Sequence, residues 1–550
     1  MMKSANYLKL LTLGCATAVL GLNLIATGAR AVSADNIVYE AEYLILQQQM
    51  NGAWKQEDAV VEKKLAALRA KYGKPPNIIH IMWDDNSLGE VGVPLMNKVL
   101  GFDTPQINKM AAEGISFSRM YTEPACTPTR AAALTGRLSV RSGMFKVGFP
   151  PDGMGLATEE VTIAEVLSEV GYKTAFFGKG HQGDIEESYL NNQGFDYANF
   201  SLYNQFPSLT WQRELIVSGA IQGLFPEQQD RLYTIDKTFR PLGYVNQVEG
   251  RKGEPARVFT GTSILDYKKL LRTNQRQVIN YIKDNAGKED PFYIAYWPHV
   301  YDLARKPEDL TTSAGTWYAE SLVQLDSDIG EVLETLKAQG IAENTLVIAM
   351  ADNGPMHELA PMGPHDVIFK GGKGDYLEGG IRVPAFAWWP GTIEPNQTVG
   401  DIVAVHDLFT TFASLAGAMD EIPNDRVIDG IDQTALIVNG DGHSRRDYYH
   451  VYIGDILAAS IKQQFKRVWL NDRPGLVGDA FHDLYKDPRE DHGEMPPFLW
   501  AWAPFDHMKT RHETLIKKYP NRAPTHGTPY QGLKDLPAAA AALARTVPVP

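Results

Sequence analysis

The sequence has little cysteine, no excess of positive charge and, beyond its first thirty residues, no long apolar run. Only Cys15 and Cys126 occur in 550 residues, and the formal net charge is −13 without any basic tract. This charge balance argues against nucleic acid or an anionic membrane surface as a partner, although a locally positive site can still bind an anionic substrate. The length suits one large domain and one smaller domain.

Residues 1–31 have the pattern of a cleaved signal peptide. Lysines precede an apolar run over residues 10–26, and residues 29–31 (Ala-Arg-Ala) form a small-x-small cleavage site. A permanent membrane anchor is the alternative, but the run is short and is interrupted by Asn23. Cleavage would leave Cys126 as the one cysteine, which cannot form an internal disulfide. We expect a secreted or periplasmic protein with no stable membrane span.

Four short apolar runs each end abruptly in polar residues, and they predict the centre of the fold. They are Asn77–Trp83 before Asp84 and Asp85, Lys173–Phe177 before Lys179 and His181, Phe292–Trp297 before His299, and Thr345–Met350 before Asp352 and Asn353. Near-continuous apolar strands suit a sheet that is buried on both faces. Ligands of such sheets collect beyond the carboxyl ends of the strands. These ends are where all four polar clusters fall.

Amphipathic helices lie between the strands. One begins with a capping box at Thr162 and stops at Gly171, and another runs from about residue 318 to Gln339 before Gly340. Strands that alternate with helices predict an α/β fold with a mostly parallel mixed sheet. We expect this main domain over residues 75–428.

The segments outside this pattern are assigned separately. Residues 32–74 predict a helical arm that packs on the main domain. Residues 184–290 are rich in aromatic side chains and interrupt the pattern, either as a packing layer or as a substrate rim. Residues 429–535 predict a smaller α+β domain with an antiparallel sheet, and 536–550 a poorly ordered tail.

The stretch from Cys126 to Arg137 (CTPTRAAALTGR) carries the most specific signal. Pro128 suits a first helical turn, so Cys126 is expected at a helix N-terminus, with Arg130 one turn on. Such a position favours anions and thiols of low pKa. The alternative is a small buried cysteine before a helix. The whole string, however, resembles the signature of type I sulfatases, and the resemblance extends from about residue 77 to about residue 490.

The resemblance implies an alkaline-phosphatase-like α/β/α domain and a chemical function. In this family the cysteine is oxidised to formylglycine by a formylglycine-generating enzyme, and its hydrate is the nucleophile that forms a covalent sulfo-enzyme intermediate. We therefore expect a small-molecule or saccharide sulfate ester as substrate. Arg130 would orient the modified residue.

Two pairs of polar residues at strand ends predict a metal site. Asp84 and Asp85 repel each other unless a cation lies between them, and with Asp352 and Asn353 they offer hard oxygen ligands. This donor set suits Ca²⁺, or Mg²⁺, and not zinc. The resemblance implies the same four ligands, with position 126 as a further one.

Further motifs supply the positive charge and the acid–base groups. The string Gly178–Gly183 (GKGHQG) keeps the family's Lys and His as Lys179 and His181, but Gly180 and Gln182 depart from it. By resemblance, Lys179 bridges sulfate and formylglycine, and His181 takes a proton from the second hydroxyl. His299 and Lys373 would bind sulfate or assist the leaving alcohol. His357 and His365 could line the pocket and are not assigned to it.

Two other functions remain open at this point. A formylglycine-dependent phosphonate or phosphate monoester hydrolase would suit the same metal and lysines. An inactive exported binding protein would show decay at the matched positions, and none is seen. The sequence does not identify the natural substrate.

Overall fold

The computed structural model describes residues 37–148, 152–204, 245–261, 264–300, 310–357, 367–439, 442–470, 481–493 and 499–528. The predicted signal peptide, His365, the predicted tail and the middle of the 184–290 stretch lie outside these residues. Within the described ranges, no helix has both the length and the apolar character needed to span a bilayer.

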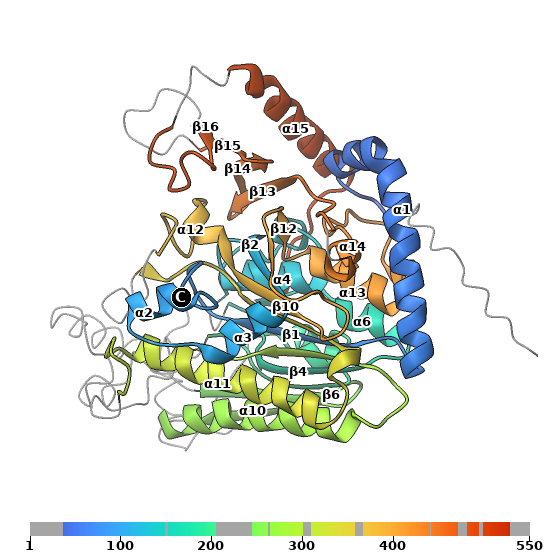
Figure 1. The fold of residues 1–550 in the computed structure, drawn as a ribbon, viewed down its shortest axis with the longest axis vertical. Coiled ribbons are helices and arrows are strands. Elements are labelled where there is room, and N and C mark those ends of the chain that lie inside the picture. The colour runs from blue at the N-terminus through green and yellow to red at the C-terminus, as the bar shows by residue number, and fades with distance from the viewer. Residues whose placement is uncertain are drawn as a thin grey trace, which may run out of the picture.

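A large mixed sheet forms the centre of the molecule (Figure 1). In spatial order its strands are β11 (Gln397–Val399), β2 (Ile115–Tyr121), β10 (Arg382–Trp388), β9 (Thr345–Ala351), β1 (Asn77–Trp83), β8 (Phe292–Trp297), β4 (Lys173–Lys179), β5 (Tyr197–Ser201), β6 (Val245–Arg251) and β7 (Arg257–Gly261), with β12 (Val403–Ala404) beside β2. The five strands from β9 to β5 run parallel, whereas β10, β6 and β7 pair antiparallel to their neighbours. The predicted α/β fold with a mostly parallel sheet is confirmed.

The four predicted strands are all present in this sheet. Strands β1 and β8 have the predicted bounds, and β4 and β9 extend slightly further, to Lys179 and Ala351. Every residue of β1, β8 and β9 is buried. A strand covered on both faces needs apolar side chains at every position, which explains the continuous apolar runs.

Helices cover both faces of the sheet (Figure 1). One layer contains α3 (Pro105–Glu113), α10 (Ile264–Asn285) and α11 (Trp317–Ala338), and the other α4 (Cys126–Thr135), α6 (Ile163–Glu169) and α13 (Asp407–Ala416). The capping box predicted at Thr162 is present, since its side chain accepts from the Glu165 amide and the Glu165 carboxylate accepts from the Thr162 amide. Gly340, directly after α11, has a left-handed φ of 69°.

The stretch 184–290 contributes directly to this domain. Strand β5 extends the parallel part of the sheet beside β4, and β6 and β7 complete that edge. Helix α10 then packs over β4 and β8 in the same layer as α11. The described parts of the stretch are therefore sheet edge and helical layer, and two short 3-10 turns, Glu186–Ser188 and Leu190–Asn192, link β4 to β5.

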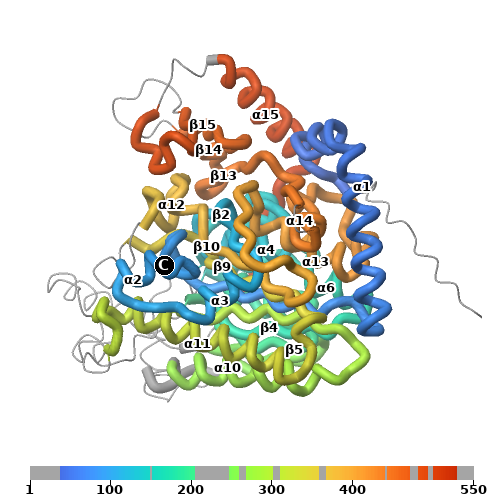
Figure 2. Tube along the Cα trace, viewed as in Figure 1, coloured from blue at the N-terminus to red at the C-terminus, as the bar shows by residue number. Residues whose placement is uncertain are grey.

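A long helix precedes the main domain. Helix α1 (Ala41–Tyr72) lies within the predicted arm and ends at Gly73 in the left-handed region. Val61 and Leu65 join the main core, and the Arg445 guanidinium stacks on the ring of Trp54 at 5.2 Å. Figures 1 and 2 show α1 along one side of the molecule, with its first turns beside α15 (Leu499–Lys518).

A second, antiparallel sheet lies towards the C-terminus. Its order is β13 (Tyr448–Ile453), β14 (Ile456–Lys462), β15 (Phe465–Val468) and β16 (Phe481–Asp483), which confirms the antiparallel sheet predicted there. The chain then returns to the main domain, where β17 (Thr525–His526) pairs with β3 (Met154–Gly155). The remaining helices are α2 (Pro94–Leu100), α5 (Ser139–Ser142), α12 (Glu378–Ile381) and α14 (Thr434–Val438), with 3-10 turns at Ala342–Asn344 and Met419–Glu421.

Candidate active site

The carboxyl ends of four parallel strands bring the predicted polar residues together. Strand β1 lies between β8 and β9, and Trp83 pairs with Ala351, so Asp84 and Asp352 follow at the same level. Lys179 is the last residue of β4. β8 ends at Trp297, and His299 comes two residues later, after Pro298. The site thus arises because parallel strands end at one edge of the sheet.

Cys126 is the first residue of α4 and is completely buried. Ala125 before it is extended, and Pro128 lies in the first turn, where an amide hydrogen has no partner within the helix. A negative charge on the Cys126 sulfur would raise the pKa values of Arg130, Asp352 and Lys373, so the sulfur lies within electrostatic range of these groups. Cys126 therefore faces the charged groups at the strand ends.

Arg130 is the central cation of the site and is fully buried. Its Nη2 donates to Asp84 Oδ1 at 3.0 Å and to Asp352 Oδ2 at 2.8 Å, and its Nη1 donates to the Lys179 carbonyl at 3.0 Å. The guanidinium also lies 5.2 Å from the ring centroid of Trp297. Lys179 Nζ donates to the same oxygen of Asp84. Two cations thus hold the first carboxylate of the site from one side.

Asp85 is held by a second set of contacts. Lys373 Nζ donates to its carboxylate at 2.9 and 3.2 Å, Asn353 Nδ2 donates to Oδ1 at 2.7 Å, and its own amide donates to Asp352 Oδ1 at 3.1 Å. Its φ of 49° is left-handed, a conformation that non-glycine residues adopt infrequently. Strain of this kind is concentrated at functional sites.

The electrostatics of the site keep Asp84 and Lys373 ionised, whereas Asp352 is raised towards its neutral form. Burial alone would raise the pKa of Asp84, but Lys179 and Arg130 hold it well below its usual range. Burial would lower the pKa of Lys373, yet Asp85 beside it holds the pKa well above its usual value. For Asp352, burial outweighs Arg130 and raises the pKa to about 7. A bound cation beside Asp352 would favour its ionised form.

His181 has one ring nitrogen poised to accept a proton. Its Nε2 lies 3.0 Å from the Gly148 carbonyl oxygen, which can only accept, so Nε2 carries the hydrogen. Nδ1 is buried and has no hydrogen-bond partner among the described residues. Burial, followed by Lys179, lowers the pKa of His181 well below its usual value. The ring is therefore neutral. The backbone of His181 has a φ of 56°, which is a strained, left-handed conformation.

His299 follows β8, which lies beside β1, the strand that leads to Asp84. Its Nε2 is 2.6 Å from Ser201 Oγ, at the end of β5. Burial lowers the pKa of His299 to about 3, with Asp84 opposing this shift. Neither histidine of the site is charged at neutral pH.

Gly180 and Gln182, the two residues of Gly178–Gly183 that differ from the resembled motif, are accommodated by local packing. A Cβ on Gly180 would lie 2.8 Å from Phe200 and 3.2 Å from Leu190, so these side chains fill the space beside position 180. Gln182 folds back and donates to the His181 carbonyl at 2.9 Å. Phe200 on β5 and Leu190 in the turn before it therefore occupy the space beside position 180.

The oxygens at the strand ends fit a hard divalent cation. Asp84 Oδ2 and Asn353 Oδ1 are buried and, within the described part of the chain, neither has a hydrogen-bond partner. Buried oxygens without partners are costly, and a cation that prefers oxygen ligands would satisfy them. Asp84, Asp85 and Asp352 are balanced by Arg130, Lys179 and Lys373, so a cation and an anionic substrate can be added together.

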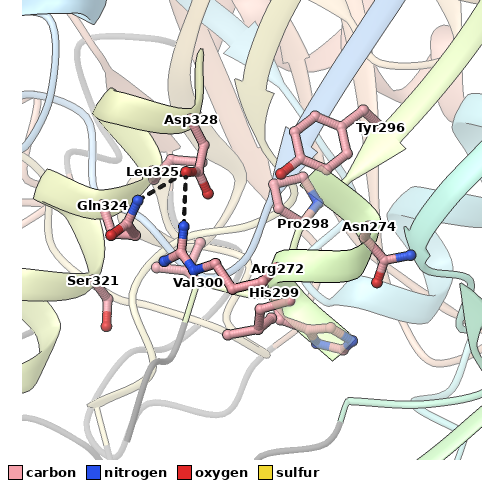
Figure 3. A pocket seen from close by; sticks show the side chains of 11 residues that line it. Arg272, Asn274, Tyr296, Pro298, His299, Val300, Ser321, Gln324, Leu325 and Asp328 are labelled. Carbon is pink, nitrogen blue, oxygen red and sulfur yellow. Dashed lines mark hydrogen bonds and ion pairs between the residues drawn. The ribbon is translucent and has the colours of Figure 1, made fainter. Parts of the chain in front are cut away.

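A small hollow lies beside His299 between α10 and α11 (Figure 3). Arg272 and Gln324 both donate to Asp328 on its wall, at 3.3 and 2.8 Å. Its volume is about 20 Å³. A space of this size holds about one water molecule. The hollow as it stands is therefore too small for an aryl group or a sugar.

The structure brings every predicted site residue into one cluster, although their individual roles stay predictions. Sequence reasoning missed Ser201 beside His299 and Tyr203, whose ring edge packs against His181 with the centroids 5.7 Å apart. The sequence signal for β5 is weak, because Asn199 interrupts the apolar residues before Ser201. His357 lies next to Gly372, whereas His365 falls outside the described residues.

Comparisons with known proteins agree with this geometry. The sulfatase family profile matches residues 76–418. N-acetylgalactosamine-6-sulfatase of Mus musculus is 29% identical over 474 residues, covering 80% of this chain and 83% of that protein. Arylsulfatase A of Homo sapiens is 32% identical over 391 residues, covering 69% and 71%. The crystal structure of PsFucS1 sulfatase from Pseudoalteromonas sp. matches with a TM-score of 0.75 at 29% identity, covering 86% and 96%.

The profile spans most of the main domain, and the curated relatives are matched over more than two thirds of their length. The expected type of fold, the signature around Cys126 and these matches lead to one assignment. The chain belongs to the sulfatase family, as a type I sulfatase of the alkaline phosphatase superfamily, and it hydrolyses sulfate esters.

Proposed function

We propose that hydrolysis depends on formylglycine made from Cys126 and on a divalent cation held at the ends of β1 and β9. The carrying observation is the position of Cys126, buried at the start of α4 and facing Arg130, Asp352 and Lys373. Hydrated formylglycine at position 126 would supply one hydroxyl to attack sulfur as the S–O bond to the alcohol breaks. Deprotonation of its second hydroxyl would break the C–O bond to sulfate and restore the aldehyde. A formylglycine-generating enzyme must reach this residue before α4 packs, because the folded chain buries it fully.

The oxygens of Asp84, Asp85, Asp352 and Asn353 are the ligands we assign to the cation, together with position 126. Calcium suits this set, and magnesium is the alternative to test. When bound, the cation polarises a sulfate oxygen. Lys179 and Lys373 provide further positive charge for the sulfuryl oxygens, and Arg130 orients position 126.

We assign the proton transfers from the protonation state of each side chain. His181 is neutral and its Nδ1 is unprotonated and without a described partner, so this atom accepts the proton of the second hydroxyl. Lys373 is protonated, and its side chain is 15% exposed while Arg130 and Lys179 are fully buried. Lys373 is thus placed to meet the alcohol on the open side of the site, with His299 hydrogen-bonding the sulfate.

The substrate class is tested with a matched pair of esters. The names of the relatives point to sulfated sugars and to aryl sulfates, so we propose a sulfate monoester of one of these two kinds. We expect para-nitrophenyl sulfate to be hydrolysed at least about 100-fold faster than para-nitrophenyl phenylphosphonate, a difference of about 2.7 kcal/mol in transition-state stabilisation. Comparable or faster phosphonate turnover would instead favour the phosphonate hydrolase that shares this superfold.

Removal of the cation is expected to lower kcat by at least about 100-fold, because a bound metal contributes several kcal/mol of charge stabilisation. Dialysis against EDTA followed by assay with added Ca²⁺ or Mg²⁺ measures this effect. The Asp352→Asn variant should not regain activity when Ca²⁺ or Mg²⁺ is added. Asp491→Asn, at an exposed carboxylate paired with Lys370, is the matched control and should recover fully. Full activity of metal-free enzyme contradicts the proposal.

We also propose that the protein is exported and that its predicted signal peptide is cleaved. Cleavage removes Cys15 and leaves Cys126 as the one cysteine of the mature protein. N-terminal sequencing of protein from the host's secreted or periplasmic fraction tests this. A mature N-terminus at about residue 32 is expected.

A further inference from the structure

A second cluster of metal-binding residue types is buried far from the active-site charges. Glu40 lies just before α1, His450 lies on β13 and His512 lies on α15. All three are almost fully buried, and one potential ligand atom from each lies within 4.8 Å of the others. Figures 1 and 2 show the start of α1 beside α15, which is where these segments meet.

Each histidine is oriented by a hydroxyl group. His450 Nδ1 lies 3.0 Å from Ser460 Oγ, and His512 Nε2 lies 2.5 Å from the Tyr452 hydroxyl. The rings stack with centroids 4.1 Å apart, and His512 Nδ1 lies 2.5 Å from Glu40 Oε1. A hydrogen bond from the outer nitrogen of a metal-binding histidine is the usual means of setting its orientation.

Beside the Glu40–His512 contact, the cluster contains two atoms that the described protein leaves unsatisfied. Glu40 Oε2 and His450 Nε2 are buried and, among residues that the structure describes, both are without a hydrogen-bond partner. A buried polar atom without a partner is destabilising unless something binds it. These two atoms belong to the residues that, with His512, surround one point in the fold. The cluster thus has the donors of a metal centre, and its hydrogen bonds leave one carboxylate oxygen and one imidazole nitrogen open to a cation.

The charge around the cluster also permits a cation. Arg141 pairs with Glu40, but the same guanidinium donates to Asp429 at 2.8 Å, so two carboxylates share one positive charge. Arg446, the next cation, is paired with Asp407 at 2.6 Å. Glu40, Asp429 and Asp407 carry three negative charges, and Arg141 and Arg446 carry two positive charges. This group of side chains therefore retains one negative charge.

We propose that Glu40, His450 and His512 supply three ligands of a Zn²⁺ site, with a water molecule as the fourth. Two imidazole nitrogens and one carboxylate oxygen are a known zinc donor set, whereas Ca²⁺ and Mg²⁺ prefer oxygen ligands alone. Tetrahedral zinc ligands at about 2.0–2.1 Å lie about 3.3 Å apart, so zinc would replace the hydrogen bond between Glu40 Oε1 and His512 Nδ1, which are 2.5 Å apart. The site joins three segments, and Glu40 and His512 are 472 residues apart in the chain. It would fasten the start of α1 and the helix α15 to the second sheet.

The test measures zinc on the full-length protein. Metal-stripped protein is exposed to Zn²⁺ with excess Ca²⁺, which occupies the oxygen site, and is then passed through a desalting column for elemental analysis. We expect one zinc per chain, and an anomalous difference peak at the zinc absorption edge between His450 and His512 in crystals. Zinc at background level, or a peak at another location, overturns the proposal and assigns the cluster to a buried water.

Substitutions distinguish the proposed zinc ligands from residues that only lie near them. His450→Gln and His512→Gln should each lose the bound zinc. His406→Gln is the matched control, because His406 is another buried histidine near the same sheet and lies outside the cluster. Tyr452→Phe retains all three donors and removes only the hydroxyl on His512, so it should weaken zinc binding by about 10- to 100-fold. Equal zinc loss in His406→Gln would contradict the assignment, and Tyr452→Phe keeps the test decisive if the histidine variants do not fold.

Discussion

Replacing Cys126 with Ala is expected to abolish sulfate-ester hydrolysis and to leave the protein folded. The substitution removes the precursor of the nucleophile, and loss of a covalent nucleophile lowers kcat on the order of 10⁴- to 10⁶-fold. The thiol is buried among Arg130, Asp352 and Lys373, so no other nucleophile from the described residues occupies its position at the start of α4. Turnover of para-nitrophenyl sulfate by purified protein is the measurement.

Two controls give this result its meaning. Cys126→Ser retains a hydroxyl at the same place and should also be inactive if the aldehyde is needed; substantial activity in this variant would show that a simple side-chain nucleophile suffices. The mass of the peptide containing residue 126, taken from active native enzyme, should be that of formylglycine. An unmodified thiol in fully active protein contradicts the proposed mechanism. Thermal unfolding near the wild-type temperature confirms that Cys126→Ala is folded.

Replacing Arg130 with Met is expected to cause the largest loss of stability in the active site. The guanidinium is fully buried and donates to Asp84, Asp352 and the Lys179 carbonyl. Removing one partner of a buried ion pair leaves uncompensated charge and costs about 3–5 kcal/mol of the free energy of unfolding. Urea unfolding of metal-free protein measures this cost. Catalysis should fall as well, because position 126 loses the side chain that orients it.

Arg141→Met is the matched control for this prediction. Arg141 is also a fully buried arginine, one helix further on, and it pairs with Glu40 and Asp429 instead of the active-site carboxylates. It should be destabilised to a similar extent, yet kcat per folded molecule should stay close to that of the wild type. If both variants lose kcat equally, the effect of Arg130 is one of general stability and not of the site. Wild-type stability of Arg130→Met would refute the charge argument itself.

Local features of the chain were sufficient for most of the elements around the site. Strands β1 and β8 have the bounds that their apolar runs predict, because a strand buried on both faces must be apolar along its whole length. The start of α6 follows from the capping box at Thr162, whose hydrogen bonds join residues only three positions apart. The signature around Cys126 and the polar residues after each strand likewise identify the chemical groups of the site without knowledge of the fold.

Contacts between distant segments were decided only by the folded chain. The strand order puts β1 between β8 and β9, and this order turns four separate clusters into one charged site. It also places β5 beside β4, so that Ser201 reaches His299 and Phe200 fills the space beside Gly180. The meeting of Glu40 with His512 has no local signal either. Periodicity and capping act over a few residues, whereas strand order, side-chain partners and buried charge depend on packing between segments that are hundreds of residues apart.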